Sequence, residues 1–185
     1  MSIPRLYIVL ISLFSLSFVS SGPRIGDIID DYNNVAVYYN GNVSHVEGRN
    51  VTHDGYNLGL RFQCVEFVKR YYYEHYGHKM PDSYGHAKSF FNKNLPSGAY
   101  NSKRGLVQFK NIRYSLPQEG DIIVYGANRM MPFGHMGIVS KVTDKKVEMV
   151  QQNWGKKSRR TLKIVEYKGI YTVADYDLLG WMRLP

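Results

Sequence analysis

The single cysteine of this 185-residue chain, Cys64, opens a stretch with the pattern of a helix. No glycine or proline occurs from Cys64 to Tyr76, and apolar and aromatic residues follow the cysteine at helical spacing. Gly77 then stands where a helix commonly ends. We therefore predict a helix that begins at or just before Cys64, with the thiol in its first turn. The free N–H groups of that turn favour a thiolate, which predicts a lowered pKa for this thiol.

The N-terminal residues have the pattern of a signal peptide. Arg5 precedes an almost wholly apolar run over 6–19, and small residues lead into Gly22. We expect residues 1–21 to be removed and residues 22–185 to form one domain. The protein is then secreted or periplasmic and touches a membrane only through the cleaved segment. The alternative is an uncleaved N-terminal anchor.

Export makes the cysteine count informative. In an oxidising compartment a lone cysteine has no partner within its own chain for a disulfide. A free thiol kept there is open to oxidation, which favours a chemical role for Cys64. The alternative is that Cys64 is a small buried hydrophobic residue.

The chain is basic, with a formal net charge of +9, and the densest positive cluster is KKSRR at 156–160. Removal of residues 1–21 deletes only Arg5 and leaves a charge of +8. Such a charge suits an anionic cell envelope or a nucleic acid, while the cluster itself also suits a solvated turn between strands. A nucleic-acid binder is the least favoured of these interpretations, so no nucleic-acid partner is expected.

The second half of the chain predicts strands. β-Branched and apolar runs bounded by turn residues occur at 120–125, 135–142, 147–153, 161–167 and 178–182. Together they predict an antiparallel sheet of about five strands, with a further short strand at 35–39. We also expect a second helix over 86–91, and loops by composition over 40–59 and 95–105. One helix that carries the cysteine and packs on such a sheet makes an α+β domain.

The hairpin that follows His135 brings polar side chains together. If its turn takes about three residues, His135 lies nearly opposite Asn153, and Gln151 shares a face with Asn153. An amide oxygen that accepts from one ring nitrogen orients the imidazole and leaves the other nitrogen to face Cys64. Asn153 is preferred because it is closer to the level of His135, and Gln151 is the alternative. His86 is the rival base.

No cofactor or metal is predicted. One cysteine and scattered histidines show none of the short ligand spacings of zinc sites. The chain also has no phosphate-binding glycine loop. The site is therefore expected to work with its own side chains.

Four sequence blocks, in this order, resemble the CHAP family of cysteine, histidine-dependent amidohydrolases/peptidases: FQCVEF at 62–67, EGDII at 119–123, GHMGIV at 134–139 and QNW at 152–154. Within the family the similarity is nearest to the amidase domain of bifunctional glutathionylspermidine synthetase/amidase, including LGWM at 179–182. It covers roughly residue 38 to the C-terminus. The resemblance implies a papain-like fold, Cys64 as nucleophile and His135 as general base. It also implies an oxyanion hole that includes the Cys64 backbone N–H.

This chain departs from the family at one position. Family members often carry glutamate where Gln151 stands. Glutamate would stabilise an imidazolium by its charge, whereas Gln151 or Asn153 only orients the ring. The departure predicts a less basic imidazole.

The expected function is an exported cysteine amidase or endopeptidase that hydrolyses an amide through a thioester acyl-enzyme. Export and basic charge favour peptidoglycan as the substrate. The alternatives are a glutathionylspermidine-type amidase and a catalytically silent module that binds the envelope. Gln63 is a candidate for oxyanion binding or support, and Glu66 for a structural partner of Lys69 or Arg70. The candidates for substrate contact are Lys69, Arg70 and Trp154.

Overall fold

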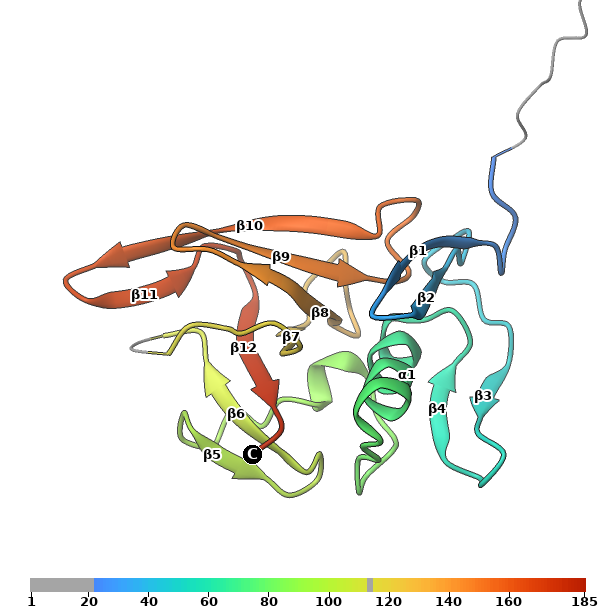
Figure 1. Ribbon diagram of the computed structural model, residues 1–185, viewed down its shortest axis with the longest axis horizontal. Coiled ribbons are helices and arrows are strands. Elements are labelled where there is room, and N and C mark those ends of the chain that lie inside the picture. Colours follow the sequence, from blue (N-terminus) through green and yellow to red (C-terminus); the bar gives the residue numbers. More distant parts are fainter. Residues whose placement is uncertain (1–21, 113–114) are drawn as a thin grey trace, which may run out of the picture.

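The computed structural model describes residues 22–112 and 115–185, which form one helix beside a large antiparallel sheet and two small hairpins (Figure 1). The expected signal peptide over 1–21 lies outside the described residues. Within the described ranges, no helix has the length and apolar character needed to cross a membrane. The elements are β1 (Ile28–Tyr32), β2 (Val35–Tyr38), β3 (Arg49–Val51), β4 (Asn57–Leu60), α1 (Cys64–Tyr76), the short 3-10 turn η1 (Ala87–Ser89), β5 (Ala99–Asn101), β6 (Leu106–Lys110), β7 (Ile122–Tyr125), β8 (His135–Val142), β9 (Lys146–Gln151), β10 (Arg159–Tyr167), β11 (Ile170–Val173) and β12 (Leu178–Arg183).

The large sheet has eight strands in the order β11-β10-β9-β8-β7-β12-β6-β5, and each neighbouring pair is antiparallel. The α+β class is confirmed, but the expectation of about five strands was wrong. The additional strands β5, β6 and β11 are three to five residues long, too short for a clear alternation of apolar and polar residues.

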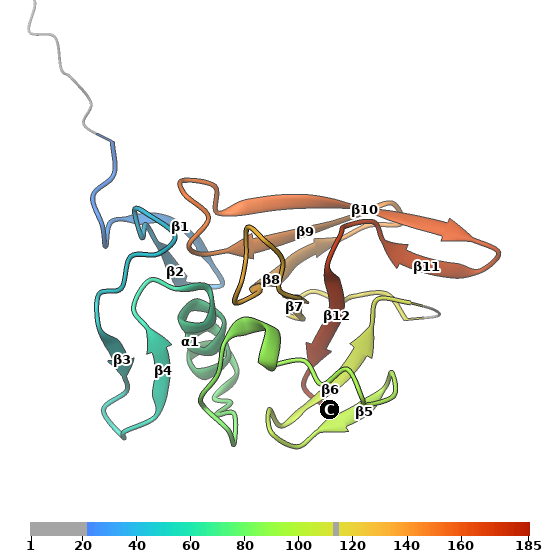
Figure 2. The same ribbon diagram turned by 180° about the vertical axis from the view of Figure 1, so that it is seen from behind.

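The helix α1 runs as the sequence predicts, from Cys64 to Tyr76. Gln63 is extended, with φ −83° and ψ 159°, so the helix begins directly after it. Gly77 has φ 64° and donates its N–H to the carbonyl oxygen of Tyr73 at 3.1 Å, which closes the C-terminus. In Figures 1 and 2 α1 lies between the β3–β4 hairpin and the large sheet.

The prediction of a second helix over 86–91 was wrong, because only the 3-10 turn η1 forms there. The Ser89 hydroxyl donates to the His86 carbonyl at 2.7 Å, and the Lys88 N–H donates to the Phe133 carbonyl at 3.0 Å. The Ser89 hydroxyl thus occupies the His86 carbonyl, which a helix would pair with the Phe90 N–H. The segment is thereby tied to the loop between β7 and β8 rather than extended as a helix.

Two apolar cores lie on the two faces of the sheet. One core joins α1 to the sheet and includes Phe67, Tyr71, Val124 and Ile138, all with no more than 1% exposure. The second includes Trp181 and lies on the opposite face, against β10 and β11. The helix is thus held firmly against β8, the strand that begins with His135.

Candidate active site

Cys64 is the first residue of α1, and its thiol is buried against the start of β8. The backbone N–H groups of Met136 and Val65 hydrogen-bond to the sulfur. Burial nevertheless outweighs them and raises the pKa of the Cys64 thiol to about 11. The expected lowering of this pKa by the helix N-terminus was therefore wrong, and the resting sulfur is a neutral thiol at pH 7.

His135 is the first residue of β8 and is 5% exposed. Its Nε2 lies 3.0 Å from Oε1 of Gln151, and since that oxygen only accepts, Nε2 carries the proton. Nδ1 is then the unprotonated nitrogen of the neutral ring. Burial lowers the pKa of His135 to about 4, partly opposed by the bond to Gln151. The resting imidazole is therefore neutral and able to accept a proton.

The structure gives the orienting role to Gln151, so the preference for Asn153 was wrong. β8 and β9 pair Gly137 with Gln151. The same register, continued by two residues, places His135 opposite Asn153, as expected. However, β9 ends at Gln151, and Asn153 has φ 64°, a left-handed conformation that turns its side chain off the sheet face. Gln151 lies on the same face as His135 and reaches it diagonally.

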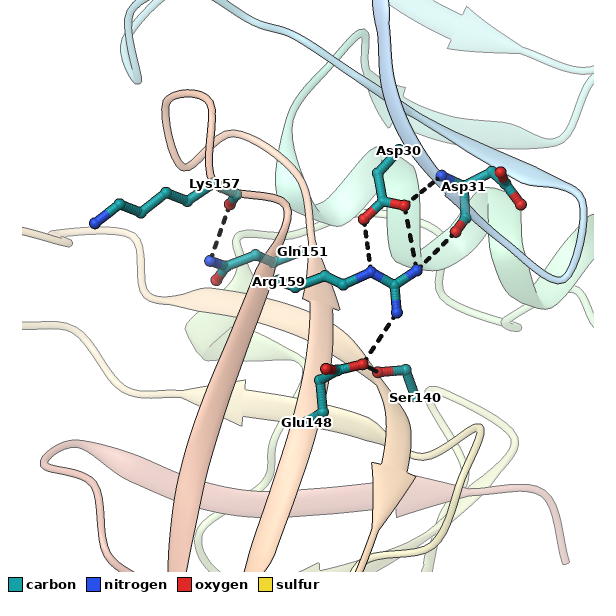
Figure 3. A network of polar contacts seen from close by, with 7 residues as sticks. All are labelled: Asp30, Asp31, Ser140, Glu148, Gln151, Lys157 and Arg159. Carbon is teal, nitrogen blue, oxygen red and sulfur yellow. Dashed lines mark hydrogen bonds and ion pairs between the residues drawn. The ribbon is translucent and has the colours of Figure 1, made fainter.

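Gln151 is itself fixed by the turn that follows β9 (Figure 3). Its Nε2 donates to the Lys157 carbonyl at 3.2 Å, and its backbone N–H donates to the Ser158 carbonyl at 2.7 Å. Arg159 follows this turn and binds Asp30 on β1, with Nε to Oδ2 at 2.8 Å. It also binds Glu148 on β9 at 3.0 Å. The amide that orients His135 is therefore anchored through the turn to a three-strand ion-pair network.

Asn153 instead joins the 40–45 loop to the start of α1. Its Nδ2 donates to Gln63 Oε1 at 2.6 Å and to the Val43 carbonyl at 3.0 Å, while its Oδ1 accepts from Asn40 at 2.8 Å. Gln63 in turn donates from Nε2 to the His45 carbonyl at 2.6 Å. Gln63 is thus bound on both sides of its amide, which favours the support role over oxyanion binding.

Lys69 and Arg70 are buried residues of α1 whose side chains bind within the fold, so their expected contact with substrate was wrong. Lys69 is fully buried and Arg70 is 5% exposed. Lys69 Nζ donates to the carbonyl oxygens of Asn57 and Ser83. Arg70 binds Glu66 at 2.7 Å, which confirms that Glu66 has a structural partner one turn along the helix.

A cleft of about 540 Å³ opens over the thiol and the imidazole. Trp154 lines it, with its ring 5.1 Å from that of His135, which supports its candidacy for substrate contact. His86, the rival base, is exposed on the rim and stacks on Phe133 at 4.4 Å. Most of the lining residues come from three loops, 43–46, 83–87 and 130–134. Sequence patterns could not assign these loops to a site. Within 22–112 and 115–185 there is no group of three His, Cys, Asp or Glu residues that could hold a metal.

A family model described as the CHAP domain matches residues 51–153, more than half of the chain. The chain belongs to the CHAP domain family. The match begins on β3 and ends just after β9, so it includes Cys64, His135 and Gln151.

Curated relatives of this CHAP domain include two kinds of protein. Trypanothione synthetase of Crithidia fasciculata is 26% identical over 164 residues, which is 82% of this chain and 25% of that protein. Bifunctional glutathionylspermidine synthetase/amidase of Escherichia coli K12 is 28% identical over 138 residues, 68% of this chain and 22% of that protein. The CHAP domain therefore spans about a quarter of the length of these relatives.

Solved structures similar to this CHAP domain include the wild-type endolysin LysIME-EF1. It is 20% identical with a TM-score of 0.40, and the match covers 76% of this chain and 59% of that one. Ly7917, solved with the hydrolysing product of MDP, is 26% identical with a TM-score of 0.30, over 44% and 32% of the two chains.

The geometry of this CHAP domain suits nucleophilic catalysis. A thiol at a helix N-terminus lies beside the His135–Met136 peptide, and a neutral imidazole with a fixed tautomer lines the same cleft. The cleft gives a substrate carbonyl access to both groups. Such an arrangement can supply a nucleophile, a base and an orienting group for acyl transfer.

Proposed function

We propose that this CHAP domain is a cysteine amidase or endopeptidase that hydrolyses an amide bond through a thioester acyl-enzyme. The single observation that carries the proposal is the hydrogen bond between His135 Nε2 and Gln151 Oε1 beside the buried Cys64. This bond leaves Nδ1 as the only basic nitrogen of the ring. The amidohydrolase/peptidase class also follows from the family.

The resting pKa values define how the nucleophile is activated in this proposal. Cys64 stays protonated and His135 stays neutral at pH 7, so His135 Nδ1 removes the thiol proton as sulfur attacks the carbonyl carbon. The negative oxygen of the tetrahedral intermediate accepts from backbone N–H groups at the start of α1. One such donor typically stabilises the transition state by about 3 kcal/mol.

Collapse of this intermediate breaks the C–N bond. The imidazolium of His135 gives its proton to the departing amine, and the acyl group remains on sulfur as a thioester. His135 then removes a proton from water, which attacks the thioester carbonyl. Departure of the Cys64 sulfur with that proton restores the resting pair.

Peptidoglycan is the substrate that we propose, cut between muramic acid and L-alanine or within the peptide. The formal charge of +8 without residues 1–21 supports attraction to an anionic envelope. Export through the signal peptide belongs to the same proposal, because the wall lies outside the membrane.

The test is mass spectrometry of peptidoglycan fragments after incubation with the protein that starts at Gly22, with Cys64→Ala as control. New fragments with the intact thiol alone establish the activity and identify the bond. Failure to cleave several wall chemistries contradicts the cell-wall substrate.

The second candidate, a glutathionylspermidine-type amidase, is supported by the names of the curated relatives. The same assay with glutathionylspermidine in place of the wall tests it. Release of spermidine, without cleavage of any wall preparation, favours this candidate over the first.

A silent envelope-binding module has less support. Of the four cations in the 156–160 cluster, Arg159 binds Asp30 and Glu148, and Arg160 binds Asp175 at 2.9 Å. This pairing reduces the charge that the cluster can offer to an anionic polymer, and it agrees with a structural turn between β9 and β10.

A further inference from the structure

The walls of the cleft above Cys64 are mostly apolar and carry one permanent charge, that of Arg49. Two histidines also line it, but none of its described lining residues is an aspartate or glutamate. The apolar side chains that share the cleft lining with this charge are Val43, Val46, Leu60, Tyr84, Met130, Met131, Phe133 and Trp154. Several of them are exposed, Met130 by 83% and Tyr84 by 63%, so the cleft is open to solvent and Arg49 is its one fixed charge.

Two carboxylates lie close in sequence to residues that line the cleft, and both bind other groups. Glu47, next to the lining residue Val46, binds the ring of His45 at 2.6 Å. Asp82, two residues before Tyr84, accepts from the Tyr84 backbone N–H at 3.0 Å. Neither side chain lines the cleft. A cationic ligand would therefore meet no anionic wall here.

Arg49 is held in place by its neighbours. It begins β3 and pairs with Leu60 on β4, four residues before the nucleophile. One terminal nitrogen donates to Asn57 Oδ1 at 2.9 Å, and Asn57 donates from Nδ2 to the Ser83 carbonyl at 3.0 Å. The guanidinium lies 5.5 Å from the ring centre of Tyr84.

This anchoring leaves the guanidinium with unused donors. Within the described part of the chain Arg49 forms no ion pair, and its side chain makes one hydrogen bond. Guanidinium has five N–H groups in a planar fork that fits a carboxylate. The fork is therefore restrained and solvent-exposed, and its remaining donors are able to bind an anion at the cleft wall.

We infer that Arg49 binds a carboxylate of the substrate, so that the cleft favours amides whose acyl or amine part carries a carboxylate over those that carry none. This inference rests on the proposed amidase function and specifies its substrate class. A carboxylate gains a bidentate ion pair beside apolar walls, whereas the ammonium groups of a polyamine meet Arg49 as a like charge. Wall peptides carry free carboxylates, and so does the γ-glutamyl residue of glutathionylspermidine, so the inference is tested on a ligand pair that differs in the carboxylate alone.

The test measures binding to the Cys64→Ala protein, which removes turnover. The ligands are a muramyl dipeptide with one free carboxylate and the same dipeptide with that carboxylate converted to carboxamide. Titration calorimetry is expected to give about two- to fivefold tighter binding of the carboxylate than of the carboxamide, the size of one exposed ion pair.

Two substitutions assign this preference to Arg49. Arg49→Gln should abolish the preference for carboxylate, and Arg49→Lys should retain part of it, because the charge remains while the fork is lost. Arg61→Gln removes an exposed charge near the cleft that is not part of its lining, so it should leave the preference unchanged. Thermal melting checks that each variant is folded.

Equal affinity for the two dipeptides, no binding of either, or a preference that survives Arg49→Gln would overturn the inference. Cleavage by the intact protein is measured separately. Selective binding without cleavage contradicts the amidase function and leaves the carboxylate site standing. Cleavage without selectivity contradicts the carboxylate site alone.

Discussion

At the scale of single residues, the environment of Cys64 and His135 keeps both groups neutral. The sulfur is buried, and the imidazole has an amide rather than a carboxylate as its partner. A neutral pair transfers its proton during the attack on the substrate instead of holding separated charges beforehand. The pH dependence of thiol alkylation and the acid limb of the kcat/KM profile should both depend on these neutral resting states.

Alkylation of Cys64 by iodoacetamide should keep accelerating as pH rises through the neutral range. The pKa of the thiol is raised to about 11, and only the thiolate reacts, so the rate should increase about tenfold per pH unit between pH 6 and 9. Mass spectrometry of the modified protein gives the rate, and the lone cysteine leaves no background. A rate already constant below pH 7 would instead indicate a resting thiolate–imidazolium pair.

Replacing Gln151 with glutamate should raise the pKa of His135. The new carboxylate stabilises the imidazolium, so the pKa should move up from about 4 by about one unit or more. Because protonated His135 cannot accept the thiol proton, the acid limb of kcat/KM must move to higher pH. Gln151→Ala removes the orienting group without adding charge, and should lower kcat/KM about 10- to 100-fold without that shift. Superimposable pH profiles for Gln151→Glu and the intact protein would contradict this role of Gln151.

At the scale of elements, a buried polar network holds α1 at the angle that presents Cys64. Glu66 on the first turn binds Arg70 at 2.7 Å, accepts from Gln152 at 2.8 Å and accepts from Asn50 at 2.9 Å. Gln152 also accepts from the Tyr38 backbone N–H at 2.8 Å. The network therefore connects the helix to β2, to β3 and to the end of β9.

Glu66→Ala should destabilise the protein strongly, because it leaves a buried guanidinium without its carboxylate. A loss of about 3–5 kcal/mol is typical when one partner of a buried ion pair is removed. The free energy of unfolding from urea denaturation measures the loss. Glu74→Ala, on the exposed side of the same helix, is the control and should change it by about 0.5 kcal/mol or less. Equal effects of the two substitutions would show that the network contributes little.

The elements that sequence patterns predict well are those with long periodic stretches. The bounds of α1 and β8 agree with the prediction because each is a long apolar pattern ended by clear turn residues. The β1–β2 hairpin was not predicted, although Asn33 and Asn34, both with positive φ, supply a usable turn signal.

The sequence predicted correctly how β8 and β9 pair at the site. Cys64 and His135 stand where the sequence places them, but the choice between Gln151 and Asn153 depended on one backbone angle. Asparagine adopts left-handed φ more readily than most residues, yet nothing in the sequence required it to do so at 153. The cleft walls depend on how three loops fold, which local patterns do not encode.

At the scale of the whole molecule, Lys69 joins the catalytic helix to the segment that forms one wall of the cleft. Its ammonium is fully buried, and it donates to the Asn57 and Ser83 carbonyl oxygens, with Tyr56 stacked nearby. It forms no ion pair with a carboxylate among the described residues. Burial lowers the pKa of Lys69 to about 7.

The free energy of unfolding should therefore rise with pH between about 7 and 10. In this window the unfolded chain holds the Lys69 proton while the folded protein has lost it, so proton release favours the folded state. The gain should be of the order of a few kcal/mol, and a neutral amine still donates to both carbonyls. Urea denaturation across the pH range measures it. Lys69→Met should remove this rise, and an identical slope in both proteins would contradict the assignment.

The burial of the only thiol also bears on the lifetime of the protein. Oxidants such as hydrogen peroxide attack the thiolate form, which at pH 7 is a small fraction of a group with a pKa of about 11. The lone cysteine has no second thiol in its chain with which to form an inactivating disulfide. The resting protein should thus keep its nucleophile in air without a reducing agent. In the proposed mechanism the sulfur loses its proton only as it bonds to the substrate, so no free thiolate would accumulate for an oxidant to attack.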